Sequence, residues 1–284
     1  MPQTINTNLI SLDAQRNLSM SQASLATSMQ RLSSGLRINS AKDDAAGLAI
    51  ATRMDSQVRG MNVAMRNAND AISLSQTAEG ALGNVTNMLQ RMRELAVQAA
   101  NGTNSSTDRA SLDAEYQQLS EEAKRTMAGT QFNGQTVLAT TATSTFQIGA
   151  NTSSTLDQIT VAGFNWSTNA VTGAVGSALG TAVSGISGAD GTNATAAISN
   201  IDAAITAINS QRATYGAVQN RFANVVSNLQ LSAENQTAAR SRIMDADYAA
   251  ETSNLSRSQI LQQAGNAMVA QANQLPSQVL SLLR

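Results

Sequence analysis

Apolar residues recur at spacings of three and four along the C-terminal segment of the chain, residues 258–284. The recurring positions are Leu261, Gly265, Met268, Ala272, Leu275, Val279 and Leu282. Residues at these spacings form one stripe along a helix. An isolated helix of this length is only marginally stable in water unless a partner covers its apolar stripe. The pattern therefore predicts a C-terminal helix that requires a packing partner.

The N-terminal segment shows a second pattern of the same kind. Leucine recurs every seven residues, and two further apolar residues fill intermediate positions. The set is Leu18, Leu25, Met29, Leu32 and Leu36. Such a heptad pattern is typical of a short coiled-coil seam. Polar residues 39–44 end it, about as far from the N-terminus as the charged residues 240–247 lie from the C-terminus. We therefore expect the two end segments to pair.

A long helical pattern follows from about residue 44 to residue 100, with Asp43 or Asp44 as its N-cap. At 1.5 Å per residue this helix would extend roughly 85 Å, much longer than the helices of ordinary globular domains. After Asn101-Gly102, the dipeptide Thr107-Asp108 signals the start of a shorter helix. Helices of this length with short connections favour a bundle with coiled-coil packing.

The period of the pattern changes in the middle of the chain. Short alternating runs at about residues 130–161 predict β-hairpins, with Asn133-Gly134 as one turn. Residues 162–194 are rich in Gly, Ala, Ser, Thr and Asn and contain no Lys, Arg or Glu. We expect them to form a short, variable, surface-exposed insert. A helical pattern returns at residues 198–229.

These elements predict a mainly α fold. A discontinuous coiled-coil bundle of long helices would be formed by the N- and C-terminal segments, with a small β-hairpin-rich region and the insert in the middle. The expected domains are a terminal coiled coil of residues 1–43 and 245–284, a helical core of residues 44–161 and 195–244, and the insert at 162–194.

The composition excludes several classes of chemistry. The chain contains no Cys and no His, so thiol nucleophiles, histidine bases, disulfides and Cys/His zinc sites are ruled out. The formal net charge is −1, which gives no electrostatic case for binding nucleic acid. No apolar run approaches the roughly 20 residues of a membrane span, and no signal peptide is apparent. We expect no catalytic activity, cofactor or metal.

Four acidic residues flank the two interruptions of the helical pattern. Asp43 and Asp44 lie in one and Asp245 and Asp247 in the other, an arrangement that invites comparison with a carboxylate metal site. Each pair is adjacent to a helix start, where a carboxylate caps backbone N–H groups. Helix capping and solvation of the loops are therefore favoured over a metal site.

Four longer motifs are distinctive as a set. They are SSGLRINSAKDDAAG at 33–47, QRMRELAVQ at 90–98, RSRIMDADY at 240–248 and VLSLLR at 279–284. Together they resemble bacterial flagellins, over about residues 1–161 and 195–284. The resemblance implies a subunit that polymerises with its own kind into the helical flagellar filament used for swimming, with the terminal segments paired as a coiled coil in the inner tube.

The resemblance also implies a route and a set of partners. The subunit would leave the cell through the flagellar type III export apparatus, held before export by a flagellar chaperone, and would be extracellular. The filament cap and the hook-associated proteins would be further partners, together with innate immune receptors of a host.

One stripe on the long helix is a candidate interface. Arg91, Leu95 and Gln98 repeat the core spacing but are displaced by one residue, or 100°. They form either the edge of a wide buried face or a contact between subunits. By resemblance, the surface read by a Toll-like receptor corresponds to Gln90, Arg91, Leu95, Gln98, Glu115, Phe222 and Asn224. Leu280, Leu282 and Leu283 correspond to a motif read by cytosolic immune receptors.

Two alternatives to a filament subunit can be stated. A hook–filament junction protein would share the terminal helices, although the motifs at 90–98 and 279–284 favour flagellin itself. A flagellin whose insert carries a metalloprotease would need a His-Glu-x-x-His helix, which a chain without His cannot supply.

Overall fold

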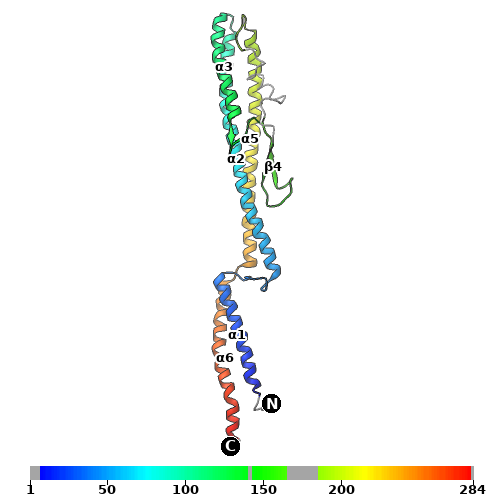
Figure 1. Ribbon diagram of the computed structural model, residues 1–284, viewed down its shortest axis with the longest axis vertical. Helices are drawn as coiled ribbons and strands as arrows, with labels where there is room; N and C mark the ends of the chain where they lie inside the picture. Colours follow the sequence, from blue (N-terminus) through cyan, green and yellow to red (C-terminus); the bar gives the residue numbers. More distant parts are fainter. Residues whose placement is uncertain (1–6, 140–142, 165–184, 283–284) are drawn as a thin grey trace. The chain divides into compact units, whose positions relative to one another are not determined.

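Long helices dominate the computed structural model, which describes residues 7–139, 143–164 and 185–282 (Figure 1). The helices are α1 (Leu9–Ser34), α2 (Ala45–Ala100), α3 (Ser106–Gly129), α5 (Thr192–Met244) and α6 (Tyr248–Leu282). The strands are β1 (Gln131–Phe132), β2 (Gln135–Thr136), β3 (Ser144–Gln147) and β4 (Gln158–Val161). The prediction of a mainly α fold built from long helices is confirmed.

The described chain divides into two compact units. Met1–Ser56 and Glu234–Arg284 form unit 1, and Gln57–Ala233 form unit 2. Helices α2 and α5 contribute residues to both units. The predicted domain limits at residues 43 and 245 stay a prediction, because the two helices run through the positions at which the units divide.

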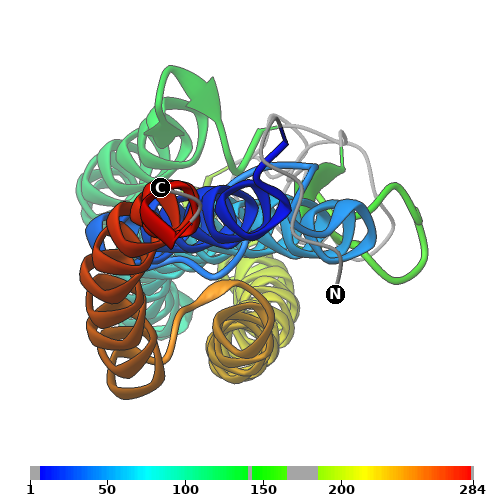
Figure 2. The same ribbon diagram turned by 90° about the horizontal axis from the view of Figure 1, so that it is seen from below.

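Unit 1 contains the pair of terminal helices, α1 and α6, which lie side by side and antiparallel (Figure 1, Figure 2). Near the start of α1, Asn8 donates to the carbonyl of Ala272 at 2.7 Å, and the Ser11 hydroxyl donates to Asn273 Oδ1 at 2.7 Å. Further along, Gly265 lies so close to Leu18 that an added Cβ would sit 3.1 Å from its Cδ1 atom. The expected pairing of the end segments is therefore present within one chain.

The connections of unit 1 are joined by backbone hydrogen bonds. Gly35 ends α1 in the left-handed conformation, with φ 71°, which glycine adopts without steric cost. The Gly35 carbonyl accepts from Ala246 N at 2.9 Å, and Arg37 N donates to the Met244 carbonyl at 2.6 Å. Ile38, Ala51 and Met244 form a small core beneath these contacts.

Two of the four acidic residues of these connections, Asp44 and Asp247, act as helix caps, as predicted. Asp44 Oδ1 accepts from Gly47 N at 2.8 Å at the start of α2, and Asp247 Oδ1 accepts from Ala249 N at 2.9 Å at the start of α6. Asp43 accepts from Ser40 and Asn39, and these hydrogen bonds lower the pKa of its carboxyl. Among the described residues, no group of three or more acidic side chains is placed to hold a metal ion.

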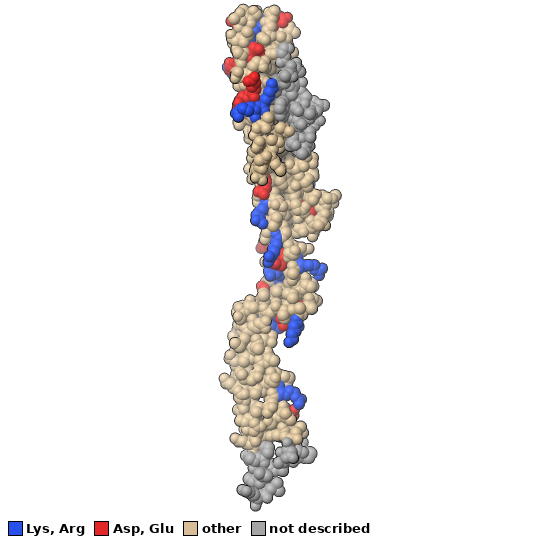
Figure 3. All heavy atoms as spheres, viewed as in Figure 1, with Lys and Arg blue, Asp and Glu red and all other residues tan. Residues whose placement is uncertain are grey.

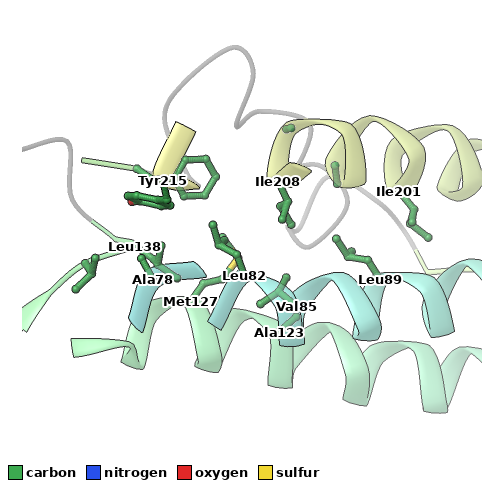
Figure 4. Close-up of a cluster of buried hydrophobic side chains, with 14 of the residues drawn as sticks. Ala78, Leu82, Val85, Leu89, Ala123, Met127, Leu138, Ile201, Ile208 and Tyr215 are labelled. Atoms are coloured by element: carbon green, nitrogen blue, oxygen red, sulfur yellow. The ribbon is translucent and has the colours of Figure 1, made fainter. Parts of the chain in front are cut away.

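Unit 2 is a three-helix arrangement of α2, α3 and α5 with a continuous apolar core (Figure 4). Leu82 and Leu89 of α2 lie between Ile208 and Ile201 of α5 and the apolar side of α3, which supplies Met127. All five side chains are fully buried. Burial of such a side chain stabilises the folded state by roughly 1.5–3 kcal/mol, so this core holds the three helices together.

Two antiparallel hairpins complete unit 2. β1 pairs with β2 across Asn133-Gly134, whose φ values of 50° and 77° are those of a tight hairpin turn. β3 pairs with β4 with Phe146 opposite Ile159. The Phe146 ring meets Phe222 of α5 edge to face, with centroids 5.7 Å apart. The predicted hairpins and their first turn are confirmed.

Three residues of the expected surface insert are instead buried. Phe164 is 5% exposed, and Ile186 and Ala194 are fully buried. Phe164 and Ile186 carry large apolar side chains, whose burial is favoured. The end of the expected insert differs too, because α5 begins at Thr192. Residues 165–184 of the insert lie outside the described residues.

Candidate assembly interface

The seam between α1 and α6 is formed by small and polar side chains. Its buried residues are Ser11, Ser28, Glu251, Ser258 and Ala272. Leu18, Leu25 and Leu32 are only half-buried along it. Small side chains allow two helix backbones to approach closely, which leaves little of the larger side chains inside the pair. The seam thus explains how the two helices meet, but it covers only part of their apolar surface.

Several large apolar side chains of the terminal helices face away from this seam. On α1 these are Leu9, Ile10, Leu12, Met20 and Met29, and on α6 they are Ile260, Leu261 and Met268. Their exposed fractions lie between 49% and 66%. Scattered exposed apolar residues are common on protein surfaces, but a concentration of this kind on two paired helices indicates an interaction surface.

Three residues predicted for terminal coiled-coil packing therefore lie outside the seam of the single chain. Met29 follows the buried Ser28, and Leu261 and Met268 each precede a seam position by one residue. One residue corresponds to 100° of rotation, which turns these side chains out of the seam. The side chains of Leu275, Val279, Leu280 and Leu282, and all of Leu283, lie outside the described part of the chain.

Charged side chains are scarce on the terminal helices. On the face shown in Figure 3, the atoms of α1 and α6 are largely those of uncharged residues. No charged residue occurs from Ser258 to Leu283 in the sequence. Burying an unpaired charge costs several kcal/mol, so a surface without charges can be covered at low cost.

A second candidate surface lies on α2 in unit 2. Gln90, Arg91 and Gln98 are exposed there. Arg91 donates to Glu94 Oε2 at 2.9 Å and to Glu115 Oε1 of α3 at 3.0 Å. These hydrogen bonds raise the pKa of the Arg91 guanidinium, the bond to Glu94 having the larger effect. The predicted grouping of Arg91 with Glu115 is therefore present in the structure.

The other predicted residues of this surface lie elsewhere. Leu95 is 2% exposed and belongs to the core of unit 2. Its side chain therefore lies at the edge of a wide buried face, the first of the two interpretations of the stripe. Phe222 is fully buried against Phe146. Asn224 is exposed, but it lies 22 residues along α5 from Asp202, the residue that pairs with Arg93. At 1.5 Å per residue this is roughly 33 Å, so Asn224 forms a separate patch.

Three residues of the α2 surface were not identified from the sequence. Arg93, Glu94 and Val97 join Gln90 and Gln98 around a shallow hollow of about 570 Å³. Val97 is 49% exposed, and Arg93 makes a bidentate contact with Asp202 of α5, the shorter distance being 2.7 Å. The spacing of four from Arg93 to Val97 was the available signal, since it places both on one side of the helix.

None of the described helices is sufficiently long and apolar to cross a bilayer. The fold and the exposed surfaces together define a long-helix protein that presents apolar, charge-poor faces for association with other chains.

Comparison with known proteins identifies the family. Residues 5–143 match the bacterial flagellin N-terminal helical region, and residues 198–283 match the bacterial flagellin C-terminal helical region. A flagellin of Halalkalibacterium halodurans is 46% identical over 282 residues, covering 99% of both chains. The flagellar filament 33 kDa core protein of Treponema phagedenis is 44% identical over 291 residues, again covering 99% of both.

Among solved structures, flagellin of Bacillus cereus is 36% identical, with a TM-score of 0.48, covering 62% of this chain and 94% of that one. The chain belongs to the bacterial flagellin family. It is a structural subunit of the flagellar filament, and its full-length similarity to flagellins favours this function over that of a hook-associated protein.

Proposed function

We propose that this chain polymerises by burying the exposed apolar faces of α1 and α6 against neighbouring copies. The observation that carries the proposal is the concentration of half-exposed Leu, Ile and Met side chains on two paired helices that carry few charges. Apolar burial stabilises association by roughly 25 cal/mol per Å² removed from water. Few ionic groups on these helices oppose it.

The same arrangement accounts for export before assembly. The seam of α1 with α6 is rich in serine and leaves large side chains uncovered, so the isolated pair gains little from apolar burial. Ordering of the two helices is then coupled to assembly. We propose that the chain reaches the extracellular filament through the flagellar type III apparatus, with a chaperone, the filament cap and hook-associated proteins as partners. Its role is structural, without catalysis.

The exposed α2 surface around Gln90, Arg91 and Gln98 is proposed as a second contact between subunits. Its polar side chains, with the bridged Arg91 and Glu115, are suited to a specific rather than a purely apolar interface. The same surface is the proposed contact for a Toll-like receptor. The motif of Leu280, Leu282 and Leu283 is the proposed contact for cytosolic immune receptors.

Substitution of Met268 tests the polymerisation proposal. Met268 is 60% exposed, so Met268→Asp leaves the single chain intact but places a charge in the face that polymerisation would cover. We expect the critical concentration for seeded polymerisation to rise by at least about tenfold, because an uncompensated buried charge is costly. Sedimentation and negative-stain electron microscopy measure this effect.

The matched control is Met268→Leu, which conserves apolar character and should polymerise at nearly the wild-type concentration. Circular dichroism of the three soluble proteins establishes that their helix contents agree. Wild-type chain that forms no filaments, or Met268→Asp chain that polymerises as well as wild type, would contradict the proposal.

A further inference from the structure

A groove runs along one side of the α1–α6 pair in unit 1. It has a volume of about 910 Å³. It is lined by small side chains, including Ser21, Ser24 and Ser258, and by the apolar side chains of Met20 and Leu261. Small lining side chains leave room for those of another helix.

Two of the residues that line the groove are positively charged. Arg31 and Arg257 both line it, together with a single carboxylate, Glu251. The Arg31 Nη1 to Glu251 Oε2 distance is 3.7 Å, which is too long for a hydrogen bond. The Arg31 Nε atom is buried without a hydrogen-bond partner, and Arg257 forms no ion pair within the described chain. The groove is thus lined by two guanidinium groups and one carboxylate, and a second carboxylate would balance its charge.

The terminal helices themselves contain one carboxylate that could do so. Asp13 and Glu251 are the acidic residues of α1 and α6, and the Glu251 side chain is only 10% exposed, whereas that of Asp13 is 67% exposed. Leu9, one turn before Asp13, is 64% exposed. Residues 9–16 thus carry an exposed apolar group and an exposed negative charge one turn apart.

We propose that residues 9–16 of a second copy of this chain occupy the groove, with Asp13 against Arg31 and Arg257. Leu261 and Arg257 are also one turn apart on α6, at the same four-residue spacing as Leu9 and Asp13. When the second α1 lies parallel to the first, Leu9 meets Leu261 while Asp13 meets Arg257. This inference rests on the proposed function and specifies one contact within it.

The contact joins two different surfaces of the same chain, and this determines the kind of assembly. Such a heterologous contact does not close on itself in a dimer and can continue from copy to copy. Gly265 lies beside Leu18, which places Arg257 beside the middle of α1 in the antiparallel pair. Successive copies would then be displaced by roughly 20 Å along the helix axis.

Charge exchange between copies tests this contact. Asp13→Arg and Arg257→Asp each place like charges together, and we expect each variant alone to need at least about tenfold more protein to polymerise. In an equal mixture, Arg at position 13 of one variant meets Asp at position 257 of the other. The next contact along the assembly joins Asp13 of the second variant to Arg257 of the first, as in wild type. We expect the mixture to polymerise within about threefold of the wild-type concentration.

Arg16→Gln is the matched control, because Asp13 also lies 3.3 Å from Arg16 on its own helix. This variant removes that pair, keeps Asp13 and should polymerise like wild type. The groove contact is overturned if either charge reversal alone leaves polymerisation unchanged. It is also overturned if the mixture needs as much protein to polymerise as either variant alone. The same holds if Arg16→Gln raises the required concentration as much as Asp13→Arg does. Failure of wild-type chain to polymerise would instead overturn the proposed function.

Discussion

Arg91 and Arg109 show how differently one residue type is used in unit 2. Arg91 is exposed and bridges Glu94 and Glu115 on the surface. Arg109 is 3% exposed and donates to three backbone carbonyls, those of Ala99 at 2.8 Å, Ala189 at 3.0 Å and Asn101 at 3.1 Å. The last turn of α2 has no basic residue of its own, so Arg109 of α3 supplies the positive charge that a helix C-terminus favours.

Removal of the Arg109 guanidinium is expected to destabilise unit 2. Arg109→Met keeps much of the side-chain volume but leaves three carbonyls without their donor. We expect the free energy of unfolding to fall by about 3 kcal/mol, measured by urea denaturation followed by circular dichroism.

Arg93→Gln serves for comparison, since it breaks an exposed ion pair with Asp202 of good geometry. Exposed pairs contribute little, so its unfolding midpoint should stay close to wild type. Equal midpoints for the two variants would show that burial does not distinguish these arginines.

At the scale of the element, α3 begins in a reciprocal hydrogen-bonded cap. Asp108 N donates to the Ser105 hydroxyl at 3.2 Å, and Ser105 N donates to Asp108 Oδ2 at 3.0 Å. The Ser105 hydroxyl also donates to Asp108, at 2.7 Å. These bonds lower the pKa of the Asp108 carboxyl, the hydroxyl bond having the largest effect.

The lowered pKa makes the contribution of this cap depend on pH. A carboxyl whose pKa is lower in the folded chain stabilises it above the ordinary pKa, 3.8 for Asp, and loses that contribution as the pH falls through the lowered value. We expect Asp108→Asn to melt at a lower temperature than wild type at about pH 6 and the gap to close towards about pH 3. Thermal melts across this range measure it, and a gap independent of pH would contradict the assignment.

At the scale of the whole molecule, the two units differ in what stabilises them. The large core of unit 2 consists of residues from Ala68 to Phe222 and includes none from α1 or α6. The terminal pair in unit 1 instead leaves its large apolar side chains exposed. Folding of unit 2 and association through the terminal helices should therefore be separable.

Deletion of residues 279–284 tests this separation. It removes the end of a charge-free segment that assembly is proposed to cover, so we expect seeded filament growth to be lost. The main thermal transition, which reports the core of unit 2, should shift by less than about 2 °C, because no core residue is removed. A large loss of that transition would show that the terminal helix also stabilises unit 2.

Particular residues show how much of this could be predicted from the sequence. The period of the pattern located α2 to within one residue, and Asn133-Gly134 identified the turn between β1 and β2. Both signals are local in the sequence. The start of α3 was expected at Thr107-Asp108, but the cap is Ser105, with Asp108 completing it three residues on. Both residue types cap helices, and the choice between them depends on the neighbouring backbone.

The candidate site divides in the same way. Arg91 and Glu115 are brought together as expected, whereas Leu95 and Phe222 are buried and Asn224 lies far along α5. Helical spacing gives the angle of a side chain around its own helix. It does not say which neighbouring helix covers that angle, and this decides whether Leu95 is core or surface.

The sequence by itself determined that this chain forms long helices, that its ends pair, and that cysteine or histidine chemistry is absent, because periodicity and composition are properties of the chain alone. Only the tertiary structure decided that the seam of α1 and α6 is built from Ser28, Ser258 and Ala272, and that Met29, Leu261 and Met268 face outwards. The choice depends on how closely two backbones approach, and small residues permit the closest approach. The apolar side chains left outside are those proposed to meet the next copy.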